Sequence, residues 1–381
     1  MFMNTTEKLL APPEYPASQA PQHVTKLVRP TPWQKATQLA FLRFEKKDLR
    51  EAERFWIDFG LLTVSRSAEQ LVMRGAGTEP AILVATKAEQ SRFVGSAFVV
   101  PGDTDFARLE RESQAKPLAA SRIPGGGRGV ALQDPDGNDL WLIADWGSVP
   151  ALPTRPPLHG EMNVLGDIRR VNRTVRSAIE PALVGRLGHF VYQTNNFAAM
   201  AEWYMRHIGI IPTDVQYLED GSPIVTFFRL DLGDLPADHH TFVLASALEP
   251  RYEHSAWEVI DLDALGQGQQ IMHTRGHEHF WGIGRHLLGS QLFDYWKDAD
   301  GFDFEHYTDG DVFTADHETR YVPFTTGSIW AWGDDAPREI FPAKSLGLVW
   351  RALKLIRQGR MSFAKLRLIG KTLDTPARPW L

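Results

Sequence analysis

Three side chains of types that commonly bind metals stand in apolar segments of the C-terminal half. They are His189 in LGHFVY, His254 in YEHSAWEV and Glu305 in GFDFEHY. The apolar neighbours of each residue predict a β-strand. Two imidazoles and one carboxylate form the facial ligand set of non-haem Fe(II) sites, which leaves coordination positions open for a substrate and dioxygen. Zinc hydrolases use the same ligand types, but their helical H-E-x-x-H pattern is absent from this sequence.

An internal repeat sets these residues apart from ordinary core histidines. The aligned segments are 38–61 with 187–210, 95–100 with 254–259, and 134–141 with 298–305. The first pair predicts a short strand, a helix and a glycine stop in each half. In this alignment the first half has Ala40, Gly95 and Trp141 at the positions of His189, His254 and Glu305. One copy therefore carries a complete ligand set and the other carries none.

The composition excludes several other kinds of site. The 381-residue chain has no cysteine, so disulfides, zinc fingers, iron–sulfur clusters and thiol nucleophiles are excluded. A net charge of −6 argues against a general nucleic-acid binder. Of the 13 histidines, only His23 lies in the first 158 residues. A protein-held metal must therefore use His, Asp or Glu side chains, and nearly all the histidines lie in the second half.

One stretch of the second half resembles the signature of a known enzyme family. GIGRHLLGSQLFDYWKDADGFDFEHY (282–307) is similar to the signature of the type I extradiol ring-cleaving dioxygenases. These belong to the vicinal oxygen chelate superfamily, with glyoxalase I and the bleomycin-resistance proteins. The matching positions are Gly284, His286, Tyr295, Gly301 and Glu305. The resemblance spans about residues 37–310 and implies an α+β fold of paired βαβββ modules, in two domains with cupped mixed sheets.

The resemblance implies a metal only in the second domain. His189, His254 and Glu305 would bind Fe(II), with Mn(II) as an alternative. The implied substrate is a small aromatic with two adjacent hydroxyls, and O₂ is the co-substrate. The implied reaction inserts O₂ beside the diol of this catechol and gives a ring-opened semialdehyde or keto acid.

The resemblance also implies the groups around the substrate. His240, the second residue of the pair in DHHTFVLA, would be the acid–base group, and His239 beside it would contribute to substrate binding. His286 and Tyr295 would contact the substrate oxygens and act in catalysis. The sequence departs from the family at 287–289, where Leu-Leu-Gly follows His286 and the family often has Asn-Asp, and at Ala299, where the family has Pro.

Two other functions remain open at this point. One is a metal-dependent lyase or isomerase of the same superfamily, and the other is a non-catalytic protein that binds an aromatic ligand. The 12 tryptophans and 21 phenylalanines permit a bulky apolar substrate such as a biaryl or alkyl catechol, although cores use the same residues.

The domain organisation follows from the repeat and from the proline-rich stretch between its copies. We expect an extended N-terminal arm (1–35), a non-metal domain (36–147), a linker (148–185), a catalytic domain (186–330) and a basic C-terminal extension (331–381). Within the extension, a helix is expected from Ser345 to about Gln358 with one apolar side. That side would pack on the chain's own body or another subunit, or alternatively would form a membrane or partner surface.

The chain has no run of 18 apolar residues and does not begin with a basic stretch followed by an apolar one. We therefore expect a cytoplasmic enzyme with no integral membrane segment and no nucleic-acid partner. A homo-oligomer is expected, with the two tails as candidate subunit contacts.

Overall fold

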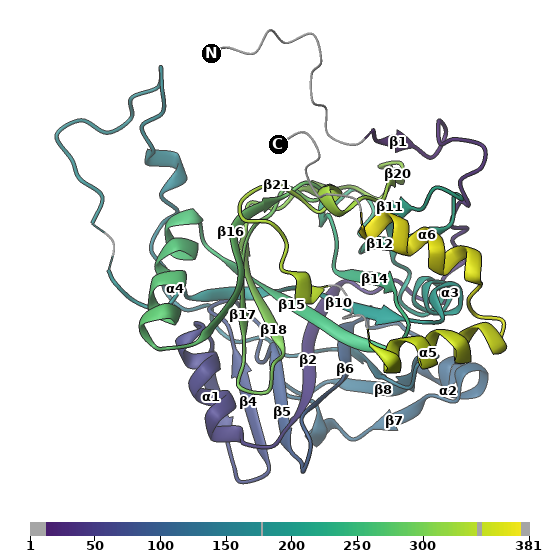
Figure 1. The fold of residues 1–381 in the computed structure, drawn as a ribbon. Coiled ribbons are helices and arrows are strands. Elements are labelled where there is room, and N and C mark those ends of the chain that lie inside the picture. Colours follow the sequence, from purple (N-terminus) through teal and green to yellow (C-terminus); the bar gives the residue numbers. More distant parts are fainter. Residues whose placement is uncertain (1–12, 177, 341–344, 375–381) are drawn as a thin grey trace, which may run out of the picture.

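A computed structural model of the chain describes residues 13–176, 178–340 and 345–374. Within them the chain forms two large sheets (Figure 1). The strands of the first sheet are β2 (Gln38–Lys46), β3 (Leu62–Arg66), β4 (Gln70–Arg74), β5 (Leu83–Lys87), β6 (Arg92–Val99), β7 (Lys116–Leu118), β8 (Arg128–Gln133) and β9 (Asp139–Ala144). Its helices are α1 (Leu49–Asp58) and α2 (Phe106–Ser113).

The second sheet repeats this plan. Its main strands are β10 (Val184–Thr194), β11 (Ile211–Tyr217), β12 (Pro223–Arg229), β14 (Phe242–Ser246), β15 (Arg251–Val259), β16 (Glu278–His286), β17 (Leu292–Lys297) and β18 (Asp303–Thr308). Its helices are α3 (Phe197–Ile208) and α4 (Leu262–Thr274). Shorter strands are β1 (Tyr15–Pro16), β13 (Ala237–Asp238), β19 (Val312–Phe313), β20 (Arg320–Pro323) and β21 (Trp330–Trp332).

The strand orders confirm the predicted α+β fold of paired βαβββ modules. The first sheet runs β3-β4-β5-β2-β6-β9-β8-β7, and the second contains β11-β12-β14-β10-β15-β18-β17-β16. In both, the first strands of the two modules pair antiparallel at the centre, β2 with β6 and β10 with β15. Each of these strands pairs in parallel with the last strand of its own module. Each sheet is therefore two copies of one module, side by side.

Strand pairing corrects the sequence alignment by one residue. On β6, Ala97 pairs with Phe41 and Trp141, and on β15, Ala256 pairs with His189 and Glu305. The residue at the position of His189 in the first sheet is therefore Phe41, and the expectation of Ala40 was wrong. A register shift lies just before this point in both strands, so the two copies share it. An alignment that is wrong by one residue assigns a strand residue to the wrong face of the sheet.

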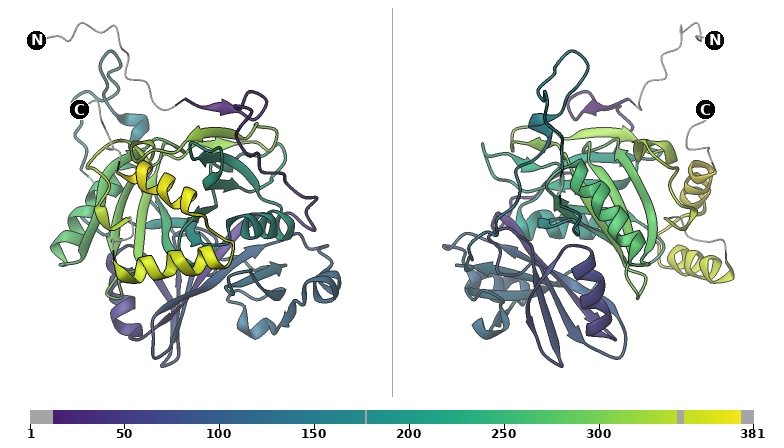
Figure 2. Two further views of the ribbon diagram at one scale, coloured as in Figure 1. Left: turned by 45° about the vertical axis from the view of Figure 1, so that its right-hand side comes forward. Right: turned by 90° about the vertical axis from the view of Figure 1, so that its left-hand side faces the viewer.

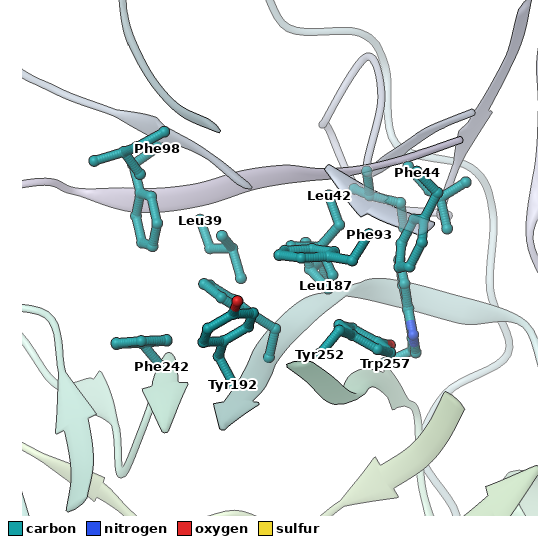
Figure 3. Close-up of a cluster of buried hydrophobic side chains, with 14 of the residues drawn as sticks. Leu39, Leu42, Phe44, Phe93, Phe98, Leu187, Tyr192, Phe242, Tyr252 and Trp257 are labelled. Atoms are coloured by element: carbon teal, nitrogen blue, oxygen red, sulfur yellow. The ribbon is translucent and has the colours of Figure 1, made fainter. Parts of the chain in front are cut away.

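The two sheets pack against each other through a shared aromatic core (Figure 3). Phe93 of the first sheet stacks on Tyr252 of the second with ring centroids 5.1 Å apart, and Phe44 meets the same tyrosine edge-on at 5.3 Å. Figure 3 shows the side chains of both sheets filling the space between them. Because this core buries one face of each sheet, a binding site on either sheet must lie on the opposite face.

Two reciprocal polar contacts cross this interface at the D-x-D-G turns. The fully buried ammonium of Lys46, at the end of β2, contacts Asp298 and lies 3.2 Å from Asp300 in the turn of the second half. In the other direction, the hydroxyl of Tyr204 on α3 donates to Asp134 in the turn of the first half, at 3.1 Å. Each half therefore anchors the turn of the other.

The described part of the N-terminal arm lies along the second sheet. Tyr15 and Pro16 form β1, which pairs antiparallel with β20, and β20 in turn pairs in parallel with β11. The guanidinium of Arg29 binds Asp231 at 2.7 Å. Residues 1–12 of the predicted arm lie outside the described residues.

The C-terminal extension contains two helices, α5 (Leu346–Arg357) and α6 (Phe363–Leu373). The predicted helix from Ser345 is confirmed as α5, whose first turn is capped by the Ser345 hydroxyl. Ala352 and Leu355 of α5 are buried, whereas Leu346 and Trp350 on its other side are exposed. Figure 2 shows the two helices side by side along the second sheet. Residues 341–344 and 375–381 of the extension lie outside the described part. None of the helices in the described residues is suited by length and apolar character to cross a bilayer.

Candidate metal centre

His189, His254 and Glu305 converge on the face of the second sheet that points away from the first. They come from three adjacent strands, β10, β15 and β18. One nitrogen of each histidine and one carboxylate oxygen all lie within 4.8 Å of one another. The Nε2 atoms of His189 and His254 are 3.4 and 3.3 Å from Oε2 of Glu305. Among the described residues this is the only cluster of its kind, and it contains the three residues that the sequence predicted.

The donor atoms of this cluster lack the partners that a buried polar group normally has. Glu305 is fully buried, and neither of its carboxylate oxygens has a hydrogen-bond partner. Nε2 of His254 is likewise buried and without a partner. A buried carboxylate needs a hydrogen-bonded partner or a cation. The geometry and the donor types therefore fit a divalent metal held by two nitrogens and one oxygen.

The surrounding charges favour an ionised carboxylate at this point. Burial acts to raise the pKa of Glu305, but the imidazoles of His189, His254 and His286 outweigh it and hold that pKa well below its usual value. Burial acts to lower the pKa of His254, but Glu253 and Glu305 outweigh burial and raise that pKa to about 10. A protonated His254 in the metal-free chain lies between two carboxylates, and Glu253 raises its pKa more than Glu305 does.

Glu253 holds the orientation of His254. Its carboxylate lies against Nδ1 of His254, on the opposite side of the ring from the cluster. A carboxylate on the outer nitrogen fixes the tautomer of a metal-binding histidine and increases its basicity. The sequence reading did not single out Glu253, although a carboxylate next to the ligand in Y-E-H was a signal available for it.

A buried chain of hydrogen bonds leads away from His189. Nε2 of His240 is 3.2 Å from Nε2 of His189, and Nδ1 of His240 is 2.8 Å from Nδ1 of His239. Nε2 of His239 is 2.6 Å from a carboxylate oxygen of Asp214, which also accepts two hydrogen bonds at 2.8 Å from Arg320. Burial, together with His189 and His239, holds the pKa of His240 well below its usual value, so His240 is neutral.

These hydrogen bonds change the interpretation of His239. The cavity beside the cluster is lined by His240 but not by His239, and both ring nitrogens of His239 are already hydrogen-bonded. The position of His239 therefore does not favour the predicted contact with substrate, and it suits a residue that orients His240. Asp214 and Arg320 were missed by sequence reasoning because β11 and β20 lie far from His239 in the chain.

His286 and Tyr295 lie together on the other side of the cluster. Nε2 of His286 is 2.9 Å from the Tyr295 hydroxyl and 3.5 Å from Oε1 of Glu305. Nδ1 of the same ring is 3.0 Å from the carbonyl oxygen of Ile329, to which it donates. Burial, Glu305 and Glu253 raise the pKa of Tyr295 well above its usual value, so its hydroxyl stays protonated. Both residues line the cavity beside the cluster.

The unusual Leu-Leu-Gly stretch also lies at this site. Leu288 lines the cavity and is 7% exposed. Gly289 has a positive φ of 82°, and a Cβ at this position would lie 3.0 Å from Nδ1 of His239. A residue without a side chain is therefore needed where the loop passes the two histidines.

Four further histidines of the second half have other partners. His277 lies 2.9 Å from Asp58, and His279 lies 2.9 Å from Asp294. The ring of His273 packs against Trp296. His306, next to Glu305, points to the opposite face and stacks on Phe59 of the first half at 3.7 Å.

A cavity of about 500 Å³ opens beside the cluster. His189, His254, His240, His286 and Tyr295 line one end of it, and its other walls are mostly apolar. Its volume falls within the range of small-molecule sites, which are typically apolar with a few convergent polar groups.

Comparison with known proteins yields one curated relative and many structural neighbours. Metapyrocatechase 2 of Cupriavidus necator is 29% identical over 296 residues, which cover 77% of this chain and 88% of that protein. No family model matches the sequence.

The solved structures share the fold. Homoprotocatechuate 2,3-dioxygenase from Brevibacterium fuscum, in complex with 3,4-dihydroxyphenylacetate, aligns with a TM-score of 0.67 at 19% identity, over 84% of this chain and 96% of that one. The Mn(II)-bound glyoxalase from Novosphingobium aromaticivorans aligns with a TM-score of 0.65 at 20% identity, over 83% and 97%. In sequence this chain is therefore similar to a metapyrocatechase, and in fold it is similar to an extradiol dioxygenase and to a glyoxalase.

Proposed function

We propose that the chain is an Fe(II)-dependent extradiol dioxygenase that opens a catecholic ring beside its diol, giving a semialdehyde or keto acid. The observation that carries the proposal is the buried, unpartnered carboxylate of Glu305, facing two imidazoles at one end of a large cavity. The metapyrocatechase relative supports the same reaction class. Mn(II) remains the alternative metal, because the donor set suits both ions.

His189, His254 and Glu305 are the residues that would hold the metal. Bound there, Fe(II) supplies open coordination positions for the two diol oxygens and for O₂, and the means of passing electrons between them. Two neutral imidazoles and one carboxylate leave a net charge of +1 on the site, which favours an anionic, deprotonated diol. We propose that this half (186–330) is the catalytic domain and that the first half (36–147) binds no metal.

His240 is placed to move the proton of the substrate. Because the Asp214 carboxylate can only accept, His239 donates from Nε2 and is left with an acceptor at Nδ1. His240 then donates from its own Nδ1 to that acceptor, which leaves the Nε2 lone pair directed at the cluster. This nitrogen can accept a proton from a diol hydroxyl and return it to the product, as general base and then general acid.

Tyr295 and His286 are placed to orient the diol. Because Nδ1 of His286 donates to Ile329, the Tyr295 hydroxyl donates to Nε2 of His286, and this hydrogen bond fixes both rings beside Oε1 of Glu305. The hydroxyl oxygen of Tyr295 can then accept a hydrogen bond from a diol hydroxyl. Leu288 and the other apolar walls keep water away from this end of the cavity, which strengthens these polar contacts.

Anaerobic loading with Fe(II), followed by measurement of O₂ uptake with a panel of catechols, tests the proposal. We expect one O₂ consumed for each catechol and a product that absorbs visible light. His240→Gln should bind metal but lose activity, and His159→Gln, at an exposed residue of a short 3₁₀ helix, is the matched control. Bound iron with no O₂ uptake on any catechol would refute the dioxygenase reaction.

The same experiment separates the two other functions. A lyase or isomerase would transform its substrate without consuming O₂, and a binding protein would take up an aromatic ligand without any need for His189, His254 and Glu305. The Mn(II)-bound glyoxalase shares only the fold with this chain, so it does not favour the first of these.

A further inference from the structure

We propose that the two C-terminal helices α5 and α6 form the wall of the substrate site opposite the metal centre, and that this wall selects a catechol whose ring carries an apolar substituent of several carbons. The proposal rests on the proposed dioxygenase function and names its substrate class.

The C-terminal extension forms part of the lining of the cavity beside the cluster. The lining residues from the extension are Ile340 before the two helices, Leu348 and Arg351 of α5, Met361 between the helices, and Leu366, Ile369, Gly370, Leu373 and Asp374 in and after α6. Leu366, Ile369, Gly370 and Leu373 recur at the spacing of one helix face. One cavity is lined both by residues of the cluster and by this helix face, and Figure 2 shows α6 beside the sheet that carries the cluster.

The inner face of α6 is incompletely covered by protein. None of its residues is fully buried, and its lining residues Leu366, Ile369 and Leu373 are half-buried. Ile224 and Val225 of β12 and Leu248 after β14 line the same cavity. Apolar side chains that face each other across a cavity are stabilised by an apolar ligand that removes them from water. A bare catechol, with one ring and two hydroxyls at the metal end, would leave this part of the cavity unfilled.

The charges around the cavity argue against an acidic substituent. The charged lining residues are Arg251, Arg351, Glu249, Glu253 and Asp374, so the carboxylates are not outnumbered by the arginines. Arg351 is paired with Glu249 at 3.0 Å. Arg251 donates to Gln193, and an anionic group on the ring would meet more carboxylates than guanidinium groups along the cavity wall, whereas an apolar group needs no charged partner.

Gly370 offers a way to test the wall without disturbing the fold. It lines the cavity, and a Cβ built there would have no heavy atom within 4 Å. A larger side chain would project into open space, and replacing a helical glycine favours the helix. Gly347 on α5 is the matched control, because it is exposed, does not line the cavity, and would bring a Cβ no closer than 3.7 Å to Ser345 Oγ.

The first measurement is kcat/KM for catechol and its 4-methyl, 4-butyl and 4-hexyl derivatives with the Fe(II)-loaded full chain. We expect a rise of roughly two- to four-fold for each added methylene, as burial of a methylene implies. Gly370→Leu should lower the hexyl-to-unsubstituted ratio at least about tenfold and leave the value for catechol within about twofold. Gly347→Leu should change neither. A kcat/KM that does not change with the length of the alkyl substituent would overturn the proposal. An equal loss of kcat/KM on all four substrates in Gly370→Leu would also overturn it.

A second measurement keeps the wall separate from the reaction. Calorimetry with n-butylbenzene, which has no diol, reports binding to the apolar part of the metal-free chain. We expect binding that weakens severalfold in Gly370→Leu and is unchanged in Gly347→Leu. If this holds while no catechol consumes O₂, the dioxygenase function fails and the apolar wall stands. If catechols are cleaved but n-butylbenzene does not bind, the wall is refuted and the dioxygenase function stands.

Discussion

At the position where β18 carries Glu305, strand β9 of the first half carries Trp141. Glu305 pairs with Ala256, which also pairs with His189. In the first sheet, Trp141 pairs with Ala97, which also pairs with Phe41. Phe41 and Trp141 meet edge-on at 6.0 Å, and the Arg43 guanidinium lies 3.9 Å over the tryptophan ring. One scaffold therefore builds a polar cluster in one half and an aromatic cluster in the other.

The same contrast extends to the hydrogen-bonded histidines. Leu83 pairs with Leu42 as Phe242 pairs with Phe190, so Pro80 and Ala81 occupy the positions of His239 and His240. Proline and alanine can neither bind a metal nor transfer a proton. A buried carboxylate without a cation is costly, so a half that binds no metal is more stable with apolar residues at these positions. At these positions the second half therefore has polar side chains that can bind a metal or transfer a proton, in place of apolar side chains that would pack more stably.

The largest expected effect comes from removing the carboxylate at this shared position. Glu305→Ala should lower metal affinity by more than the roughly 10- to 100-fold that loss of an outer partner of a ligand costs, and activity should fall to background. Metal analysis after dialysis and O₂ uptake measure both, with Glu110→Ala on α2 as control. A variant that keeps one metal per chain would show that Glu305 is not a ligand.

The corresponding change in the first half should act on stability alone. Trp141→Ala removes a buried ring from the aromatic cluster and should lower the free energy of unfolding by about 3–5 kcal/mol. The metal content of the folded protein should not change. Denaturant titration and metal analysis test the two parts, and loss of metal from folded Trp141→Ala would contradict the separation of roles between the halves.

The two contacts that cross the interface should differ in strength. Lys46→Met leaves the Asp298 carboxylate buried without its cation and should cost about 3–5 kcal/mol. Tyr204→Phe removes only a hydroxyl donated to Asp134 and should cost about 1 kcal/mol. Urea unfolding of both variants provides the comparison, and similar costs would mean that the interface does not depend on the buried charge.

The histidine pair can be tested against its first-half counterpart. His239→Gln should lower kcat by roughly 10- to 100-fold with little change in KM, because it disturbs the residue that orients His240. Glutamine at 239 can still bond to one neighbour, so the fold should survive. Pro80→Ala, at the matching position of the first half, should leave kcat unchanged. If His239→Gln instead raises KM by as large a factor as it lowers kcat, the result would favour the sequence-based prediction that His239 binds the substrate.

The smallest expected effect compares two matching helix caps. Asp261 caps α4 and also binds Arg155, whereas Asp105 caps α2 through one backbone N–H. Asp261→Ala should cost about 1–2 kcal/mol and Asp105→Ala about 0.5–1 kcal/mol. Burial acts to raise the pKa of Asp261, but Arg155 and backbone N–H groups outweigh it and lower the pKa to about 2.

The sign of the pH dependence follows from this lowered value. The folded pKa of Asp261 lies below its ordinary value of 3.8, so its contribution is complete above about pH 4 and is lost as the pH falls toward 2. The stability difference between wild type and Asp261→Ala should therefore shrink over that range. A difference that stays constant down to pH 2 would contradict the role of the ionised carboxylate.

The sequence by itself determined the internal repeat and the three candidate ligands, and the βαβββ plan of the modules followed from the resemblance to the extradiol dioxygenases. Strands and helices show local periodicities, and His189, His254 and Glu305 stand out because a second copy of the pattern lacks them. The helix at 346–357 was also predicted, because its serine cap and apolar spacing are local features.

The tertiary structure alone decided the register and the groups around the cluster. Ala40 was aligned with His189, but the hydrogen-bonded ladder places Phe41 there, and a shift of one residue in a strand exchanges its faces. Asp214 reaches His239, and α6 reaches the cavity, from positions remote in the chain. Such contacts depend on how separate elements pack in space, and no local pattern encodes the distance between them.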